Sequence, residues 1–125
     1  MNLSESSLLI AVATYNERKN IDELYQRIRK TCPGAIILFL DDNSPDGTGE
    51  LISKYCESDS NVRLIRRESK LGIGSAHKCI AEQALDLGFE ALVTLDGDLT
   101  HRPEDIPRLL KKLEFADVVV ASRFE

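Results

Sequence analysis

The sequence predicts an α/β protein with a doubly wound, mainly parallel sheet, in the order βαβαβαβαβ. Short apolar runs without in/out alternation recur along the chain, which is typical of strands buried on both faces of a parallel sheet. Segments whose apolar residues are spaced as on one face of a helix lie between these runs. No repeat, low-complexity tract or linker divides the 125 residues. We therefore expect residues 1–125 to form one domain.

Five apolar runs are the predicted strands: 8–14, 35–40, 62–66, 91–95 and 118–122. Each is flanked by polar or turn-forming residues, and each has the length of an ordinary strand.

Four segments carry helical spacing. The stripes are Ile21, Leu24, Tyr25 and Ile28; Leu51, Ile52 and Tyr55; Ala76, Cys79, Ile80, Ala84 and Leu87; and Ile106, Leu109, Leu110 and Leu113. Asn20 with Glu23 resembles a capping box at the start of the first helix, and Pro103 suits the first turn of the last one. Gly88 is expected to end the third helix.

The charge balance argues against nucleic acid as a partner. Lysine and arginine total 16 against 21 acidic residues, which gives a net charge of -5. An anionic ligand must therefore be bound by local features rather than by a basic surface. Arg66, Arg67 and Lys70 are most simply interpreted as a solvated run of charge.

The three cysteines show no C-x-x-C spacing, so reduced thiols are expected rather than a zinc site or disulfides. The first residues are polar, and the apolar run behind them is too short for a signal sequence or a membrane span. These features predict a soluble, cytoplasmic chain.

Chemically interesting residues follow the predicted strands. Ala13, Tyr15 and Glu17 come at or after the end of the first strand, an acidic turn over 41–48 follows the second, Asp96-Gly97-Asp98 follows the fourth, and Arg123 follows the fifth. Because parallel strands place these loops at one edge of the sheet, we expect the residues to converge there. An aromatic ring, carboxylates and a guanidinium together suit a nucleoside diphosphate.

Asp96 and Asp98 are candidate ligands of Mg²⁺ or Mn²⁺. Two aspartates on an irregular turn offer hard oxygen donors and leave coordination positions for water and diphosphate. From the tripeptide alone, an acidic Asp-Gly turn without a ligand remains an equal alternative.

The acidic turn after the second strand has two interpretations. Asp42 could accept a hydrogen bond from a nucleotide base or a ribose, while Asp46 or Thr48 caps the next helix. Helix capping and turn formation alone are the other interpretation. The Gly72-Ile73-Gly74 step is a weak phosphate-loop signal and is at least as compatible with simple entry into a helix.

Taken in order, five segments resemble the dolichol-phosphate mannose synthase branch of family 2 glycosyltransferases, which have the GT-A fold. They are Ala-Thr-Tyr-Asn-Glu, Asp-Asp-Asn-Ser-Pro-Asp-Gly-Thr, Leu-Gly-Ile-Gly, Asp-Gly-Asp-Leu-Thr-His-Arg-Pro-Glu-Asp-Ile-Pro and Ala-Ser-Arg-Phe. The resemblance covers residues 8–125.

The resemblance implies a role for each matched position. Ala13, Tyr15, Glu17 and Asp42 would line the base and ribose of the donor. Asp96, Gly97 and Asp98 would form the metal and diphosphate site, and Arg123 would hold the diphosphate. Asp98 and Arg123 would be catalytic.

The implied reaction is inverting, metal-dependent transfer of a hexose, most simply mannose from GDP-mannose, to a polyprenyl or dolichyl phosphate. The acceptor would place the protein at the cytoplasmic face of a membrane. Family catalytic domains continue beyond Ser-Arg-Phe, so the resemblance also implies a chain truncated at its C-terminus, with exposed apolar surface that favours a homo-oligomer.

Two other functions are compatible with the residues. Leu95 to Thr100 also resembles the nucleophile loop of haloacid dehalogenase-type phosphatases, with Asp96 as the nucleophile. A nonenzymatic nucleotide-binding or interaction module would need only the donor-binding residues.

Overall fold

Four parallel strands form the centre of the protein. The computed structural model describes residues 8–68, 73–89, 91–96 and 102–111. The strands are β1 (Leu8–Thr14), β2 (Ile36–Asp41), β3 (Val62–Arg66) and β4 (Ala91–Asp96), in the order β3-β2-β1-β4. The chain builds outwards from β1 to β3 and then returns to place β4 on the other side of β1.

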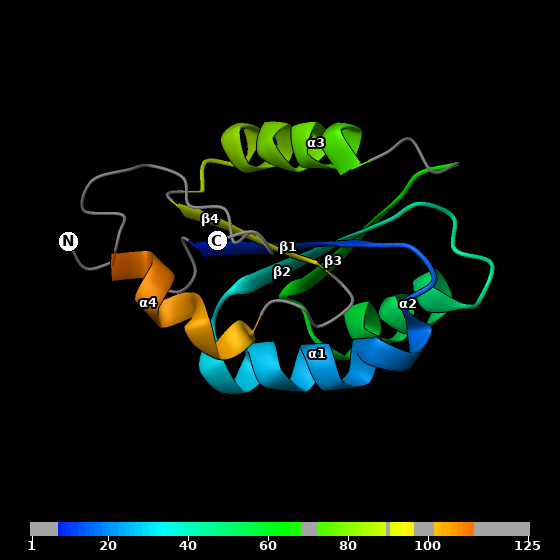
Figure 1. Cartoon of the computed structure of the whole chain (residues 1–125), viewed down its shortest axis with the longest axis horizontal. Helices are drawn as coiled ribbons and strands as arrows, with labels where there is room; N and C mark the ends of the chain where they lie inside the picture. The colour runs from blue at the N-terminus through cyan, green and yellow to red at the C-terminus, as the bar shows by residue number, and fades with distance from the viewer. Residues whose placement is uncertain (1–7, 69–72, 90, 97–101, 112–125) are drawn as a thin grey trace.

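Helices cover both faces of this sheet (Figure 1). The elements are α1 (Arg18–Thr31), α2 (Thr48–Ser58), α3 (Ile73–Asp86), the 3-10 helix η2 (Pro103–Asp105) and α4 (Ile106–Lys111). Figure 1 shows α3 on one face, with α1, α2 and α4 on the other. Among the described residues, no helix combines the length and the apolar character that crossing a bilayer requires.

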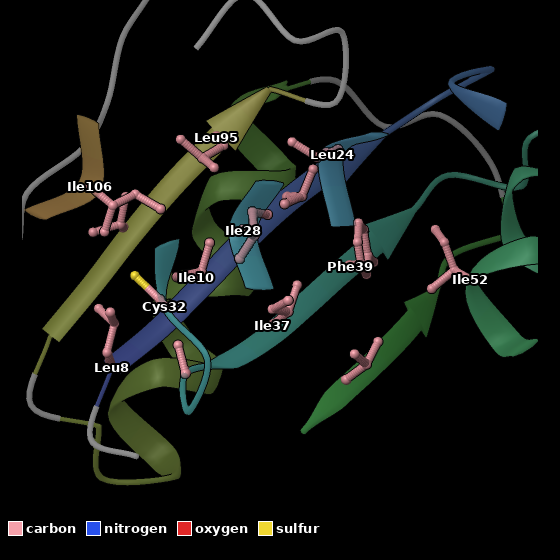
Figure 2. Close-up of a cluster of buried hydrophobic side chains, with 14 of the residues drawn as sticks. Leu8, Ile10, Leu24, Ile28, Cys32, Ile37, Phe39, Ile52, Leu95 and Ile106 are labelled. Atoms are coloured by element: carbon pink, nitrogen blue, oxygen red, sulfur yellow. The ribbon is translucent and has the colours of Figure 1, made fainter. Parts of the chain in front are cut away.

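The larger core lies between the sheet and α1, α2 and Ile106 (Figure 2). Strand residues of alternate register, such as Ile10 and Phe39, meet Leu24 and Ile28 of α1, and all four are fully buried. Because successive strand residues point to opposite faces, the intervening residues serve a second core.

The second core packs against α3. Ala76, Ile80 and Ala84 lie one turn apart on this helix and contact strand residues that include Leu38 and Leu40. Both faces of β1 and β2 are therefore buried, which explains why these strands read as continuous apolar runs.

The structure confirms the doubly wound parallel architecture and four of the predicted strands. Two of them, β1 and β3, have the predicted bounds, while β2 starts at Ile36 and β4 ends at Asp96. The predicted strand over 118–122 lies outside the described residues. No disulfide joins Cys32, Cys56 and Cys79 in the described part of the chain.

Two details of the predicted helices are wrong. No capping box starts α1: the helix begins at Arg18, and the Asn20 amide donates to the Glu17 carboxylate from within the first turn. Leu87 does not belong to the apolar stripe of α3, because the helix ends before it and its side chain is 53% exposed. The positive φ of 75° at Gly88 does agree with a glycine that terminates the helix.

A polar network joins α1 to the end of α2. The Tyr25 and Tyr55 rings stack with centroids 4.2 Å apart, and Asp59 accepts hydrogen bonds from Arg29 at 2.7 Å and from the Tyr25 hydroxyl at 2.7 Å. Partial desolvation acts to raise the pKa of Asp59. The hydrogen bonds from Arg29, Tyr25 and the Asn61 backbone outweigh it and lower this pKa from 3.8 to about 2.

We predict that Asp59 makes folding sensitive to acid. Its folded pKa is lower than its unfolded pKa, so its stabilisation is complete above about pH 4 and is lost as the pH falls towards 2. Relative to Asp59→Asn, the wild type should be more stable by about 1–2 kcal/mol at pH 7, with the difference vanishing near pH 2. Urea unfolding at a series of pH values measures this, with exposed Glu57→Gln as the control. A difference independent of pH would contradict it.

We predict that a leucine in the larger core contributes much more to the free energy of unfolding than an exposed leucine at the end of α3. Leu24 is fully buried and Leu85 is 80% exposed, so the same substitution can be compared at both sites. Leu24→Ala should lower the free energy of unfolding by about 2–5 kcal/mol, because it leaves a cavity. Leu85→Ala should change it by less than about 0.5 kcal/mol. Equal effects in chemical denaturation would show that the core has been misassigned.

Candidate functional site at the carboxyl edge of the sheet

The carboxyl ends of β1, β2 and β4 meet at one edge of the sheet. Thr14 of β1 pairs with Asp41 of β2, and Ala13 of β1 pairs with Asp96 of β4. The direction of strand order reverses between β1 and β4, and open parallel sheets bind ligands in the crevice outside such a reversal. The loop after β1 and the end of β4 at Asp96 therefore lie on either side of the expected crevice.

Asp41 is a fully buried carboxylate at this edge. Its Oδ1 accepts hydrogen bonds from Thr14 Oγ1 at 2.8 Å and Ser44 Oγ at 2.6 Å, and its Oδ2 accepts one from the Ser44 backbone N–H at 3.0 Å. The Ser44 hydroxyl in turn accepts from the Asn16 N–H at 2.9 Å. Asp41 thus connects the loop after β1 to the loop after β2.

A second set of contacts joins the same loops farther from the sheet. Thr48 Oγ1 accepts from the Glu17 N–H at 3.1 Å, and Asp46 Oδ2 accepts from the Arg18 N–H at 3.2 Å. Asp46 Oδ1 also accepts from the Thr48 N–H at 3.0 Å and from the Thr48 hydroxyl. Desolvation acts to raise the pKa of Asp46, but the hydrogen bonds from Thr48 and Arg18 outweigh it and lower this pKa.

The predicted cap of α2 at Asp46 or Thr48 is wrong in its position, because the N-cap residue is Gly47, which makes no side-chain capping hydrogen bond. The Asp46 carboxylate binds the first free N–H of the helix, at Thr48, while Gly47 between them adopts a positive φ of 90°. The same carboxylate and the Thr48 hydroxyl also bind the backbone of the neighbouring loop. The acidic turn therefore binds the first N–H of α2 from the residue before the N-cap, and it also holds the segment that carries Tyr15 and Glu17.

Asp42 is engaged in a bidentate ion pair. Its Oδ1 accepts from Arg67 Nε at 2.6 Å, and its Oδ2 accepts from Arg67 Nη2 at 2.8 Å. The hydrogen bonds that Arg67 donates to Asp42 raise the pKa of Arg67, against the effect of desolvation. The interpretation of Arg67 as part of a solvated charge run is wrong, because its side chain is only 12% exposed. Arg66 fits that interpretation better, since it pairs with Glu50 where both side chains are exposed.

The structure brings some of the predicted site residues together and leaves others outside its described part. Ala13 is half-buried at the end of β1, Tyr15 is 37% exposed, Glu17 is half-buried, and Asp42 lies buried at the end of β2. Asp96 is the last residue of β4. Gly97, Asp98 and Arg123 lie outside the described residues.

Sequence reasoning missed Asp41, Ser44 and Arg67 as organisers of the site. A signal for Asp41 was present, because an aspartate that continues an apolar strand must be satisfied by nearby donors. The Asp42–Arg67 pair joins residues 25 positions apart, and only the register of β2 with β3 reveals it.

The metal ligands predicted from the sequence are Asp96, at the end of β4, and Asp98, which lies outside the described residues. No group of three or more His, Cys, Asp or Glu residues is arranged to hold a metal within the described part of the chain. Asp41 accepts hydrogen bonds from three protein donors, and both oxygens of Asp42 are paired with Arg67. The Asp96-Gly97-Asp98 turn has donors of the right chemistry for Mg²⁺ or Mn²⁺, and the β1–β4 register places its first residue beside the expected crevice.

The sequence matches the family model described as "Glycosyl transferase family 2" over residues 9–125. The chain belongs to this family. Membership favours the glycosyltransferase interpretation of the Asp96 turn over the haloacid dehalogenase interpretation.

Similar proteins within this family include enzymes named for mannosyl transfer. The chain is 38% identical over 118 residues to a polyprenol monophosphomannose synthase from Mycolicibacterium smegmatis, covering 93% of this chain and 44% of the relative. It is 36% identical to an undecaprenyl-phosphate mannosyltransferase from Micrococcus luteus, covering 93% and 48%. The chain thus spans less than half the length of these two relatives.

A solved structure confirms the GT-A fold. A mannosyltransferase from Pyrobaculum calidifontis, solved in complex with GDP-Man and Mn²⁺, superposes with a TM-score of 0.74 at 22% identity. The match covers 88% of this chain and 33% of that protein.

We predict that Asp41 stabilises the edge of the sheet through its charge. In Asp41→Asn, one carboxylate oxygen becomes an NH₂ group that faces O–H and N–H donors, so at least one buried hydrogen bond is lost. The free energy of unfolding should fall by about 2–4 kcal/mol in chemical denaturation. Exposed Asp22→Asn is the matched control and should cost less than about 1 kcal/mol. An Asp41 variant as stable as this control would show that Asp41 does not stabilise the edge of the sheet.

Proposed function

We propose that the chain forms the donor-binding part of an inverting, metal-dependent mannosyltransferase that uses GDP-mannose and a polyprenyl phosphate. Family membership supports glycosyl transfer, and the names of the relatives from M. smegmatis and M. luteus support mannose and a lipid phosphate. The ligands of the P. calidifontis mannosyltransferase support GDP-mannose and a divalent cation. A lipid acceptor would bring this site to a membrane surface.

The observation that carries the proposal is the register of β1 with β4. It places Ala13 beside Asp96, so the loop of Tyr15 and Glu17 and the Asp96-Gly97-Asp98 turn begin at the same reversal of strand order. A nucleotide needs a surface for its base and ribose next to a site for its diphosphate, and this arrangement supports the proposal that the two lie side by side.

Different residues would contact different parts of the donor. Ala13, Tyr15, Glu17 and Asp42 would contact the base and ribose, with Asp42 using lone pairs that Arg67 leaves free. Asp96 and Asp98 would ligate Mg²⁺ or Mn²⁺, and Arg123 would contact the diphosphate. When bound, the cation would neutralise negative charge on the departing nucleoside diphosphate.

The reaction needs little help from a general base. A phosphate monoester has a second pKa near ~6, so an acceptor phosphate oxygen is already largely ionised at neutral pH. That oxygen forms a bond to the anomeric carbon of mannose as the bond to the donor diphosphate breaks, and the electron pair leaves with GDP. Attack opposite the leaving group inverts the configuration at this carbon.

We predict metal-dependent binding of GDP and GDP-mannose, but not of UDP. Calorimetric titration of each nucleotide, with and without Mn²⁺, measures it directly. Asp98→Asn should weaken binding of GDP-mannose at least about tenfold, equivalent to ~1.4 kcal/mol, because a metal ligand is lost. Asp86→Asn, at the exposed end of α3, is the matched control and should bind as the wild type does.

The possible results separate the functions. If no nucleotide binds, the proposal is overturned. If UDP binds more tightly than GDP, the donor carries uracil and not guanine. Binding without transfer of mannose to added polyprenyl phosphate would identify a nucleotide-binding module instead of an enzyme.

A further inference from the structure

Asp42 has no freedom to reorient on its own. Its side chain is 9% exposed, and both of its oxygens accept hydrogen bonds from the same guanidinium group. Such a fork fixes the plane of the carboxylate as well as its position. The backbone N–H of Asp42 also donates to the carbonyl oxygen of Thr14, at 3.2 Å, which holds the residue beside the end of β1.

Arg67 is itself anchored from three directions. Besides Asp42, its Nη1 donates to Ser75 Oγ on α3 at 2.8 Å, and its backbone N–H donates to the carbonyl oxygen of Asp41 at 2.9 Å. A single side chain therefore connects the end of β2, the segment after β3 and the first turn of α3. Asp42 lies 25 residues from Arg67 in the sequence, and Ser75 lies 8 residues from it.

The pairing leaves Asp42 able to bind a further donor. A carboxylate has about four lone-pair sites, and Arg67 occupies two of them. The remaining sites can accept a ribose hydroxyl or a base N–H, and the fixed plane determines where such a donor must lie. Arg67 also cancels the charge of Asp42, which matters at an edge that has to accept an anionic diphosphate near other carboxylates.

We propose that Arg67 is a positioning residue for nucleotide recognition: it acts through Asp42, whose carboxylate it holds in the orientation that selects the base and ribose. The inference rests on the proposed function, because it assumes that a nucleotide binds at this edge. It goes beyond that function in assigning part of the nucleotide selectivity to an arginine that contacts the ligand only through another residue.

The neighbouring arginine supplies a matched control. Arg66 carries the same charge one residue earlier, but it pairs with Glu50 at 2.8 Å on the exposed side of β3. Arg67→Gln should weaken GDP binding at least about tenfold and reduce the preference for GDP over UDP by a similar factor. Arg66→Gln should change either quantity less than about twofold.

A double-mutant cycle distinguishes positioning from a direct role. If Arg67 acts through Asp42, Asp42→Asn should weaken GDP binding by at least as much as Arg67→Gln. The double variant should then bind no more weakly than Asp42→Asn alone. Additive losses would show that Arg67 contributes independently, and they would overturn the inference.

Loss of folding is a separate risk, because Arg67→Gln leaves a buried carboxylate without its partner. Arg67→Lys keeps the positive charge but cannot form the two-pronged contact, so it should fold and still lose selectivity for GDP. The double variant removes both charges and supplies a second folded protein for titration. Thermal unfolding of every variant separates damage to the fold from damage to binding.

The titrations also separate the two hypotheses. If the wild type binds GDP and Arg67→Lys binds it with unchanged affinity and selectivity, the positioning role is wrong and the donor site stands. If the wild type binds no nucleotide at all, the donor site is wrong and the positioning role falls with it.

Discussion

The carboxyl edge of the sheet depends on the buried carboxylate of Asp41. A charged group with no exposure to water is tolerated only when donors replace its hydration, and here two side-chain hydroxyls and a backbone N–H do so. Because Thr14 ends β1 and Ser44 lies in the loop after β2, satisfying this one charge also ties that loop to the end of β1. The backbone of Asn16, with a φ of 56°, is held against Ser44 as a result.

Two adjacent aspartates serve opposite sides of the sheet edge. Asp41 accepts hydrogen bonds from Ser44, in the loop between β2 and α2. Asp42 instead pairs with Arg67, which also donates to Ser75 of α3. The alternation of strand side chains explains how neighbours in sequence come to have such different surroundings. The same alternation gives the two aspartates different roles: Asp41 holds the edge of the sheet together, and Asp42 remains able to bind a ligand.

The sequence predicted features that repeat along the chain better than features that depend on pairing across it. The apolar runs of β1 and β2 identified buried parallel strands because both of their faces carry core residues. Asn20 and Glu23 misled, since the same residue types that form a capping box also occur inside a first turn, where Asn20 bonds Glu17 instead. The Asp42–Arg67 contact could not be inferred, because it depends on the register of β2 with β3. Tyr15, Glu17 and Asp42 were predicted as site residues from their place at strand ends, where ligands bind in this architecture, and the structure describes all three at that edge.

The strand order has a consequence for how the protein acquires its site. The pairings of β1 with β2 and of β2 with β3 join segments that follow each other in the chain, but β1 must wait for β4, where Leu8 pairs with Ala91. Contacts between distant segments carry a larger cost in loop entropy and generally form later in folding. The edge at which β1 and β4 pair is therefore expected to form among the last events of folding. A molecule that binds at this edge would therefore stabilise the fully folded protein relative to partly folded forms.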